Sequence, residues 1–204
     1  MSRPATRDRI LSAASDLFVE KGYAATSTRE IAERTGIQQP GLYRHFASKA
    51  EILKALFRKV LERPERIARA LADRSEPAAE RLYRFIHDTL QSLAADNRAL
   101  AALLITPELQ SDAFAEERAI DRAGDALMAA LIATAIAEGD LETDSPERAA
   151  GVISWLLNGA YSGLDGAGVS QIADFAILAL LRKRRSLPAL RQRALAIPLA
   201  LDGS

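Results

Sequence analysis

The stretch Thr28–Lys49, TREIAERTGIQQPGLYRHFASK, decides the fold. In its first half, Ile31 and Ala32 form one apolar helix face. In its second half, Leu42 and Phe46 stand four residues apart, which places them on one face of a second helix. The pattern therefore predicts two short helices in close succession.

The break between these helices has the residues of a tight turn. Gly36 suits the left-handed backbone position that ends a helix. Pro40 fits the first turn of the next helix, where a backbone N–H has no partner to lose. Ser27 and Glu30 form a capping-box pattern at the start of the first helix. The stretch therefore predicts a helix–turn–helix, whose second helix lies in a DNA major groove with its N-terminal residues foremost.

The same residues resemble the DNA-reading head of the TetR (tetracycline repressor) family of bacterial transcription regulators. The family pattern is a Ser- or Thr-capped helix with Ile-Ala, then Gly-Val/Ile, then Leu-Tyr-x-x-Phe and Ser/Asn-Lys. This chain shows it in Ser27–Ala32, Gly36-Ile37, Leu42–Phe46 and Ser48-Lys49, followed by Ile52 and Leu53. The resemblance covers roughly the first 60 residues, and beyond them only length, helical content and helix order agree.

The reading helix begins with residues that can contact bases. Gln39 can pair with the major-groove edge of adenine, and Pro40 can touch a thymine methyl group. Gly41 lets the backbone approach closely, while Arg29 and Arg44 can each reach a guanine or a phosphate. The resemblance adds phosphate contacts, so the candidate DNA-binding residues are Thr28, Arg29, Gln38, Gln39, Pro40, Gly41, Tyr43, Arg44, His45 and Lys49.

Three of these residues leave alternatives open. Gln38 stands where many family members have Ser or Thr and is a poorer cap. The reading helix is therefore expected to become fully ordered only when it binds DNA. Tyr43 can pack its ring in the core and still offer its hydroxyl to a phosphate. Lys49 is either a phosphate contact or an ordinary surface lysine.

The composition agrees with an intracellular DNA-binding protein. Residues 1–60 hold 11 Lys and Arg against 6 Asp and Glu, whereas residues 61–204 hold 16 against 21. A basic head with an acidic body is typical of a DNA-binding module joined to another domain. The chain has no cysteine, which excludes disulfides and thiolate metal sites. No signal peptide or membrane span is visible, so a cytoplasmic location is expected.

The rest of the chain predicts an all-α fold of about nine helices. We expect a helix–turn–helix DNA-binding domain over residues 1–50, and a helical bundle for regulation, ligand binding and dimerisation over residues 51–204. Pro64 should kink or end the helix that follows Ser48. The last long helix is expected to begin at Ser170. The tail, 186–204, is not placed, although it could add a short docking helix.

The last two long helices, about 146–181, are apolar over most of their surface, which requires burial on most sides. In the family, two such helices from each subunit form a four-helix dimer interface. The resemblance therefore implies a homodimer here, and the alternative is that the glycines of this region only loosen a helix end. The candidate interface residues are Trp155, Gly159, Gly163 and Phe175.

Family members usually hold a small-molecule pocket in the body, and a ligand there moves the heads off the operator. The resemblance thus implies an effector, and the apolar surroundings favour a hydrophobic one. Each candidate lining residue is of a type that in such a position is more often a satisfied core or rim residue. The candidates are Tyr83, His87, Asn97, Trp155, Asn158 and Tyr161.

No catalytic motif is present. The segment Gly159–Gly163 lacks the spacing of a nucleophile elbow, and there is neither a phosphate loop nor metal-ligand spacing around His45 and His87. No enzyme activity, metal or cofactor is expected. The sequence predicts a ligand-responsive repressor that binds a palindromic operator as a homodimer. The alternatives are a DNA-binding regulator without a small-molecule effector, and a ligand- or partner-binding protein that has lost operator binding.

Overall fold

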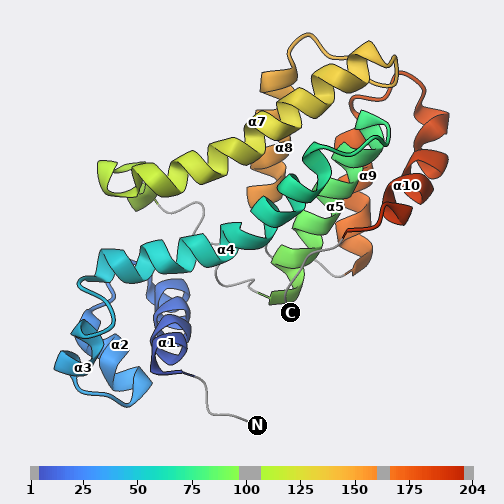
Figure 1. Cartoon of the computed structure of the whole chain (residues 1–204). Helices are drawn as coiled ribbons and strands as arrows, with labels where there is room; N and C mark the ends of the chain where they lie inside the picture. The colour runs from blue at the N-terminus through green and yellow to red at the C-terminus, as the bar shows by residue number, and fades with distance from the viewer. Residues whose placement is uncertain (1–4, 97–106, 160–165, 200–204) are drawn as a thin grey trace. The chain divides into compact units, whose positions relative to one another are not determined.

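The computed structural model describes residues 5–96, 107–159 and 166–199 (Figure 1). Within these ranges the chain forms nine α-helices, three short 3₁₀ helices and no strand. An isolated bridge between Leu141 and Leu181 is the one β-type pairing in the described ranges. The prediction of an all-α fold is confirmed.

The chain divides into two compact units. The first, called the head unit, is Met1–Val60 with Ala99–Arg118, and the second, called the body unit, is Leu61–Arg98 with Ala119–Ser204. These units do not coincide with the expected functional division at residue 50. The reason is that two helices, α4 (Lys49–Ala72) and α7 (Ala115–Ala137), each begin in the head unit and end in the body unit.

The head unit begins with three helices, α1 (Thr6–Lys21), α2 (Thr28–Thr35) and α3 (Gln39–Tyr43). Gly36 has a φ of 73° and ends α2 in the left-handed conformation, as predicted. The apolar positions of the three helices and of early α4 are buried, so the predicted faces form the core of the head. The largest of these residues are Ile10, Leu11, Leu17, Phe18, Ile31, Leu42, Phe46, Ile52, Leu53, Leu56 and Phe57.

A segment distant in sequence completes the head unit. It consists of two 3₁₀ helices, η2 (Pro107–Gln110) and η3 (Asp112–Phe114), and the first turn of α7. The ring of Phe114 meets that of Phe57 edge to face, with centroids 6.4 Å apart. Arg58 donates from Nε to Glu117 Oε1 at 2.9 Å, and the Glu117 side chain is only 1% exposed. The sequence analysis did not associate this segment with the head.

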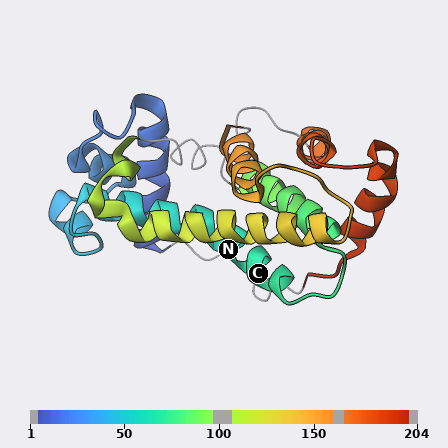
Figure 2. The same ribbon diagram turned by 90° about the horizontal axis from the view of Figure 1, so that it is seen from above.

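The body unit is built around α5 (Ala78–Asp96), which packs against α9 (Gly166–Leu178) and α10 (Leu187–Ala196) (Figure 1, Figure 2). The remaining helices of this unit are α8 (Pro146–Gly159), the end of α4, most of α7 and the 3₁₀ turn η4 (Arg184–Ser186). No helix within the described ranges has the length and apolar character needed to cross a bilayer.

Three expectations about the body need correction or completion. Pro64 does not end α4, which continues to Ala72. Burial of Ile67 and Leu71, both at 0% exposure, offsets the missing hydrogen bond of the proline. The last long helix begins at Gly166 rather than at Ser170. The tail forms α10, whose buried residues are Leu190 and Ala194.

Candidate nucleic-acid interface

The reading helix α3 is short and exposed at its N-terminus. Gln38, Gln39 and Pro40 are exposed, while Leu42 is completely buried and anchors the helix to the head. Gln38 occupies the N-cap position and makes no side-chain capping bond, so the prediction of a poor cap is confirmed. The helix therefore presents its first turn to the surroundings without help from a local cap.

Three predicted DNA contacts form a chain of hydrogen bonds on this surface. Gln39 Nε2 donates to Thr28 Oγ1 at 3.1 Å, and Thr28 Oγ1 lies 3.1 Å from the hydroxyl oxygen of Tyr43. Tyr43 is 48% exposed, so its ring is not a core residue. The fold thus places one side chain from α2 between two from α3.

The other polar candidates lie around the same helix. Arg29 is exposed and pairs with Glu33 one turn later on α2, with 2.9 Å between Nε and Oε1. In the described part of the chain no carboxylate lies within ion-pair distance of Arg44, which leaves its guanidinium available to an external anion. A hollow of about 730 Å³ beside α3 is lined by Thr6, Ile37, Gln38, Pro40, Gly41, Arg44 and His45.

Gly41 lines this hollow and lies next to the side chains of Arg44 and Ile37. A Cβ atom built there would meet nothing closer than 3.8 Å, which is an ordinary van der Waals contact. The packing of the head therefore does not require a glycine at this position. A requirement for close approach by an external molecule would explain its presence.

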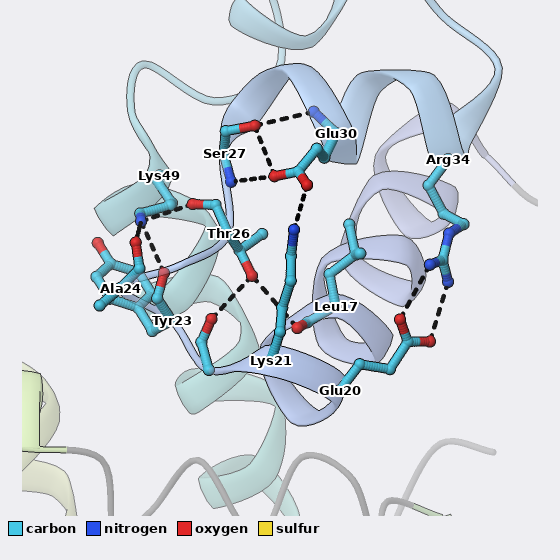
Figure 3. Close-up of polar contacts among 11 residues, drawn as sticks. Leu17, Glu20, Lys21, Tyr23, Ala24, Thr26, Ser27, Glu30, Arg34 and Lys49 are labelled. Carbon is cyan, nitrogen blue, oxygen red and sulfur yellow. Dashed lines mark hydrogen bonds and ion pairs between the residues drawn. The ribbon is translucent and has the colours of Figure 1, made fainter.

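The resemblance implied a phosphate contact for Lys49, but in the structure its side chain binds within the head. Its ammonium donates to the carbonyl oxygens of Tyr23 and Thr26, both at 2.7 Å, and to that of Ala24 at 3.4 Å (Figure 3). It also lies 4.2 Å from the centroid of the Tyr23 ring. Burial lowers the pKa of this ammonium. Because its donors are used within the head, we do not propose Lys49 as a phosphate contact.

The turn between α1 and α2 is held by further polar contacts, shown in Figure 3. Ser27 N donates to Glu30 Oε2 at 2.8 Å and Glu30 N donates to Ser27 Oγ at 3.2 Å, which confirms the predicted capping box. Lys21 forms an ion pair with Glu30. The hydrogen bond from Lys21, together with those from Ser27, lowers the pKa of Glu30 to about 2.

The sequence analysis missed Thr26, a buried residue of the same turn. Its hydroxyl donates to the carbonyl oxygen of Gly22 at 2.8 Å, and it lies 3.2 Å from that of Leu17. The Gly22 carbonyl follows the last residue of α1 and has no partner within the helix, and Leu17 lies in the last turns of α1. The position of Thr26 next to the capping box was the one available signal. We call Lys21, Thr26, Ser27, Glu30 and Lys49 the turn brace.

The predicted ligand residues are only partly brought together. Tyr83 is completely buried and donates its hydroxyl to Asp174 Oδ1 at 2.8 Å. Its ring stacks on His87 with centroids 6.2 Å apart, and His87 Nδ1 lies 3.0 Å from Asp88 Oδ1. Burial and the neighbouring Asp174 carboxylate raise the pKa of Tyr83.

Trp155 is no longer a candidate ligand residue, because its side chain is 77% exposed and does not line the interior of the body unit. Asn158 lies on α8 and is half-buried. Asn97 and Tyr161 fall outside the described residues. Among the described residues, the candidates that remain are Tyr83 and His87 on α5 and Asn158 on α8.

Apolar side chains are exposed on the helices predicted to form the dimer interface. Val152 and Trp155 lie three residues apart on α8 and are 60% and 77% exposed, while Phe175 on α9 is 63% exposed. Gly159 continues the α8 face and has no atom within 4 Å of a Cβ built on it. Gly163 lies outside the described residues.

These observations define the class of protein. A helix–turn–helix presents an uncapped reading helix with exposed Gln39, and the described body is entirely helical. No group of His, Asp and Glu within the described ranges has the arrangement of a metal site. The class is a DNA-binding, all-α regulator.

Comparison with known proteins specifies the class. The family model for bacterial regulatory proteins of the tetR family matches residues 10–56. The crystal structure of AmtR from Mycobacterium smegmatis is 30% identical, covers 98% of both chains and has a TM-score of 0.80. The crystal structure of AibR, in complex with isovaleryl coenzyme A and operator DNA, is 20% identical, covers 87% of this chain and 98% of AibR, and has a TM-score of 0.74.

The transcriptional activator FasR from Mycolicibacterium smegmatis is 42% identical over 59 residues. That match covers 29% of this chain and 27% of FasR, so it supports the shared segment only. The identity to AmtR extends over nearly the whole chain. This chain belongs to the TetR family of bacterial transcription regulators. It is a DNA-binding regulator, and the family's members are not enzymes.

Proposed function

We propose that this chain is a ligand-responsive repressor that binds a palindromic operator as a homodimer in the cytoplasm. The observation that carries the proposal is the exposed first turn of α3, where Gln39 and Pro40 stand on a helix anchored by the buried Leu42. An exposed amide on a rigid support can read a base edge in a major groove.

In this proposal, Gln39 pairs with adenine and Pro40 contacts a thymine methyl group. Arg44, His45 and Tyr43 meet backbone phosphates or a guanine around the same helix, and Arg29 does so once it exchanges Glu33 for DNA. Phosphate contacts set the register and orientation of the head, whereas the Gln39 and Pro40 contacts specify sequence. Repression follows if the bound protein occupies a promoter.

The homodimer is supported by the exposed apolar residues of α8 and α9. Leaving Trp155 and Phe175 in water at 77% and 63% exposure is unfavourable, and a second copy of the same helices would cover them. A two-fold pair of heads reads two half-sites of a palindrome. The pairing also raises specificity, because one reading helix contacts only a few base pairs.

An effector would act on the body unit. A ligand shifts the protein off DNA only if it binds the two states with different affinities. The continuous helices α4 and α7 each run from the body unit into the head unit, so both offer a route for such coupling. AibR was solved with an acyl-coenzyme A, which makes acyl-coenzyme A thioesters and hydrophobic acids a suitable first panel of probes.

One observation favours a second candidate, a DNA-binding regulator without a small-molecule effector. The Tyr83 hydroxyl is already bonded to Asp174, and Trp155 is exposed, so two of the six predicted ligand residues have no free polar group facing an interior cavity. Operator release by a member of the probe panel would exclude this candidate. A protein that has lost operator binding would fail the selection described next.

The deciding experiment is selection of bound sequences from a random duplex pool at a stated salt concentration. We expect one palindrome, and Gln39→Ala should relax specificity at one base pair of each half-site, at a cost of about 1–3 kcal/mol. Gln192→Ala, which removes an exposed glutamine of α10, is the matched control and should recover the same palindrome. Sequence-blind, salt-sensitive binding would contradict the proposal.

A further inference from the structure

One hydrogen-bond chain on the head joins two kinds of proposed DNA contact. Thr28, at the first position of α2, lies between Gln39 and Tyr43 of α3, with 3.1 Å on each side. In the proposed function Gln39 reads a base and Tyr43 meets a phosphate. Thr28 is the one link between them in the described structure.

One of the two hydrogen bonds has a defined direction. Gln39 Nε2 donates to Thr28 Oγ1, so the Thr28 hydroxyl acts there as an acceptor. Between Thr28 and Tyr43, 3.1 Å apart, either hydroxyl can donate. A phosphate oxygen that accepts the Tyr43 proton selects the direction in which Thr28 donates to Tyr43. With DNA bound, the order is then Gln39 to Thr28, Thr28 to Tyr43, and Tyr43 to phosphate.

The same arrangement prepares Gln39 for base reading. The amide nitrogen carries two protons, and only one is used by Thr28. The second proton and the amide oxygen remain for N7 and N6 of adenine, which require a donor and an acceptor side by side. A glutamine held in this way does not lose the freedom of its amide torsion when it binds.

We infer that Thr28 is a positioning residue that couples the phosphate contact of Tyr43 to base reading by Gln39. When a phosphate accepts the Tyr43 proton, the Tyr43 oxygen becomes a better acceptor for Thr28, and Thr28 in turn becomes a better acceptor for Gln39. Correct docking on the backbone thus strengthens the hold on the reading amide. The inference rests on the proposed function, and it replaces the direct phosphate contact that the resemblance implied for Thr28.

The test uses the full-length protein and operator duplexes that carry each base at the position assigned to Gln39. Thr28→Val removes the hydroxyl with little change in shape. We expect discrimination at that base pair to fall about fivefold, the value of one hydrogen bond, while the salt dependence of binding stays unchanged. Thr28→Ser keeps a hydroxyl and should restore discrimination. Thr134→Val, at an exposed threonine of α7, is the control.

Tyr43→Phe sharpens the test. It should weaken binding to every duplex and also reduce discrimination at the Gln39 base pair. The Thr28→Val and Tyr43→Phe effects on discrimination should not add in the double variant, because either change interrupts the same chain. Additive effects would overturn the inference.

Three other outcomes would also overturn it. If Thr28→Val lowers affinity equally on all duplexes and reduces the salt slope by about 1, Thr28 contacts a phosphate directly. If Gln39→Ala relaxes a base pair and Thr28→Val does not, only the coupling fails. If Gln39→Ala relaxes no base pair, the base-reading assignment of the proposed function fails together with the coupling.

Discussion

The protein exposes two surfaces of opposite character. On the head, the exposed side chains around α3 are polar, and Thr28, Gln39 and Tyr43 are already bonded to one another. On the body, the exposed side chains of α8 and α9 include the apolar residues Val152, Trp155 and Phe175. The polar surface is well solvated by water, whereas covering the apolar surface lowers its free energy.

The difference shows how one chain can carry two binding functions. A polar surface can exchange water for phosphates and base edges at little cost, and its contacts depend on hydrogen-bond geometry. An apolar surface gains from the area it removes from water and depends on shape. The head surface therefore needs a rigid support, which the turn brace supplies, and in the proposed dimer the body surface meets an apolar partner of matching form.

The largest effect is expected from a charge on the apolar surface. Trp155→Glu should weaken self-association by about 2–4 kcal/mol, roughly a hundredfold in the dissociation constant, because a buried aromatic anchor is replaced by an unpaired carboxylate. Sedimentation at several protein concentrations measures this. Val19→Glu, at an exposed apolar residue of α1, is the control. Equal association of wild type and Trp155→Glu would place the interface elsewhere.

A second large effect is expected from the support of the head surface. Lys49→Met should destabilise the head by about 2–3 kcal/mol, because the carbonyls of Tyr23 and Thr26 lose a charged donor. Hydrogen exchange of the α2 amides in the full chain reports this. Lys59→Met changes an exposed lysine of the same helix and should have no such effect. An unchanged head with a salt slope lowered by about 1 would return Lys49 to a phosphate contact.

A smaller effect is expected at Gly41, where one substitution should change the stability of α3 and the affinity for the operator in opposite directions. Gly41→Ala should stabilise α3 by about 0.5–1 kcal/mol, since the added methyl group meets no atom closer than 3.8 Å. Operator affinity should fall about tenfold nonetheless, or about 1.4 kcal/mol, because the methyl group stands where DNA approaches. Thermal unfolding and operator titration give the two values. Tight binding by this variant would show that Gly41 does not face the DNA.

The smallest effect concerns pH and the turn brace. The pKa of Glu30 is about 2 in the folded head and near 4.5 when unfolded, so its contribution to stability is present above pH 4.5 and is lost as the pH falls toward 2. Glu30→Gln should remove part of the acid destabilisation over this range. Urea unfolding of both proteins at a series of acidic pH values measures it. Identical pH dependence would mean that Glu30 has no special role.

Much of the head follows from local pattern. Ser27 with Glu30 predicted the start of α2, Gly36 its end, and Leu42 the anchored side of α3, because each of these signals acts within a few residues of chain. Gln39 was selected as a candidate reading residue for the same reason, since the start of the second helix of a helix–turn–helix can be located from nearby residues. The all-α class followed from periodicity over the whole chain.

Other features depend on residues that are far apart in sequence. Lys49 donates to carbonyls more than twenty residues earlier in the chain. Its neighbours in sequence give no sign that its side chain points into the head. Glu117 pairs with Arg58 across 59 positions. Pro64 stays within α4 because the following turns are buried, which no local signal reports.

The helix–turn–helix and the helical class follow from the sequence alone, because caps, breaks and apolar spacing are local properties, and the candidate reading residues follow from their positions in this motif. The tertiary structure alone decided which polar side chains hold the head together and which face outward. It turned Lys49 inward, placed Thr28 between Gln39 and Tyr43, and left Trp155 exposed. The physical reason is that burial and hydrogen-bond partners are set by distant segments, and a residue's type does not reveal which segment will meet it.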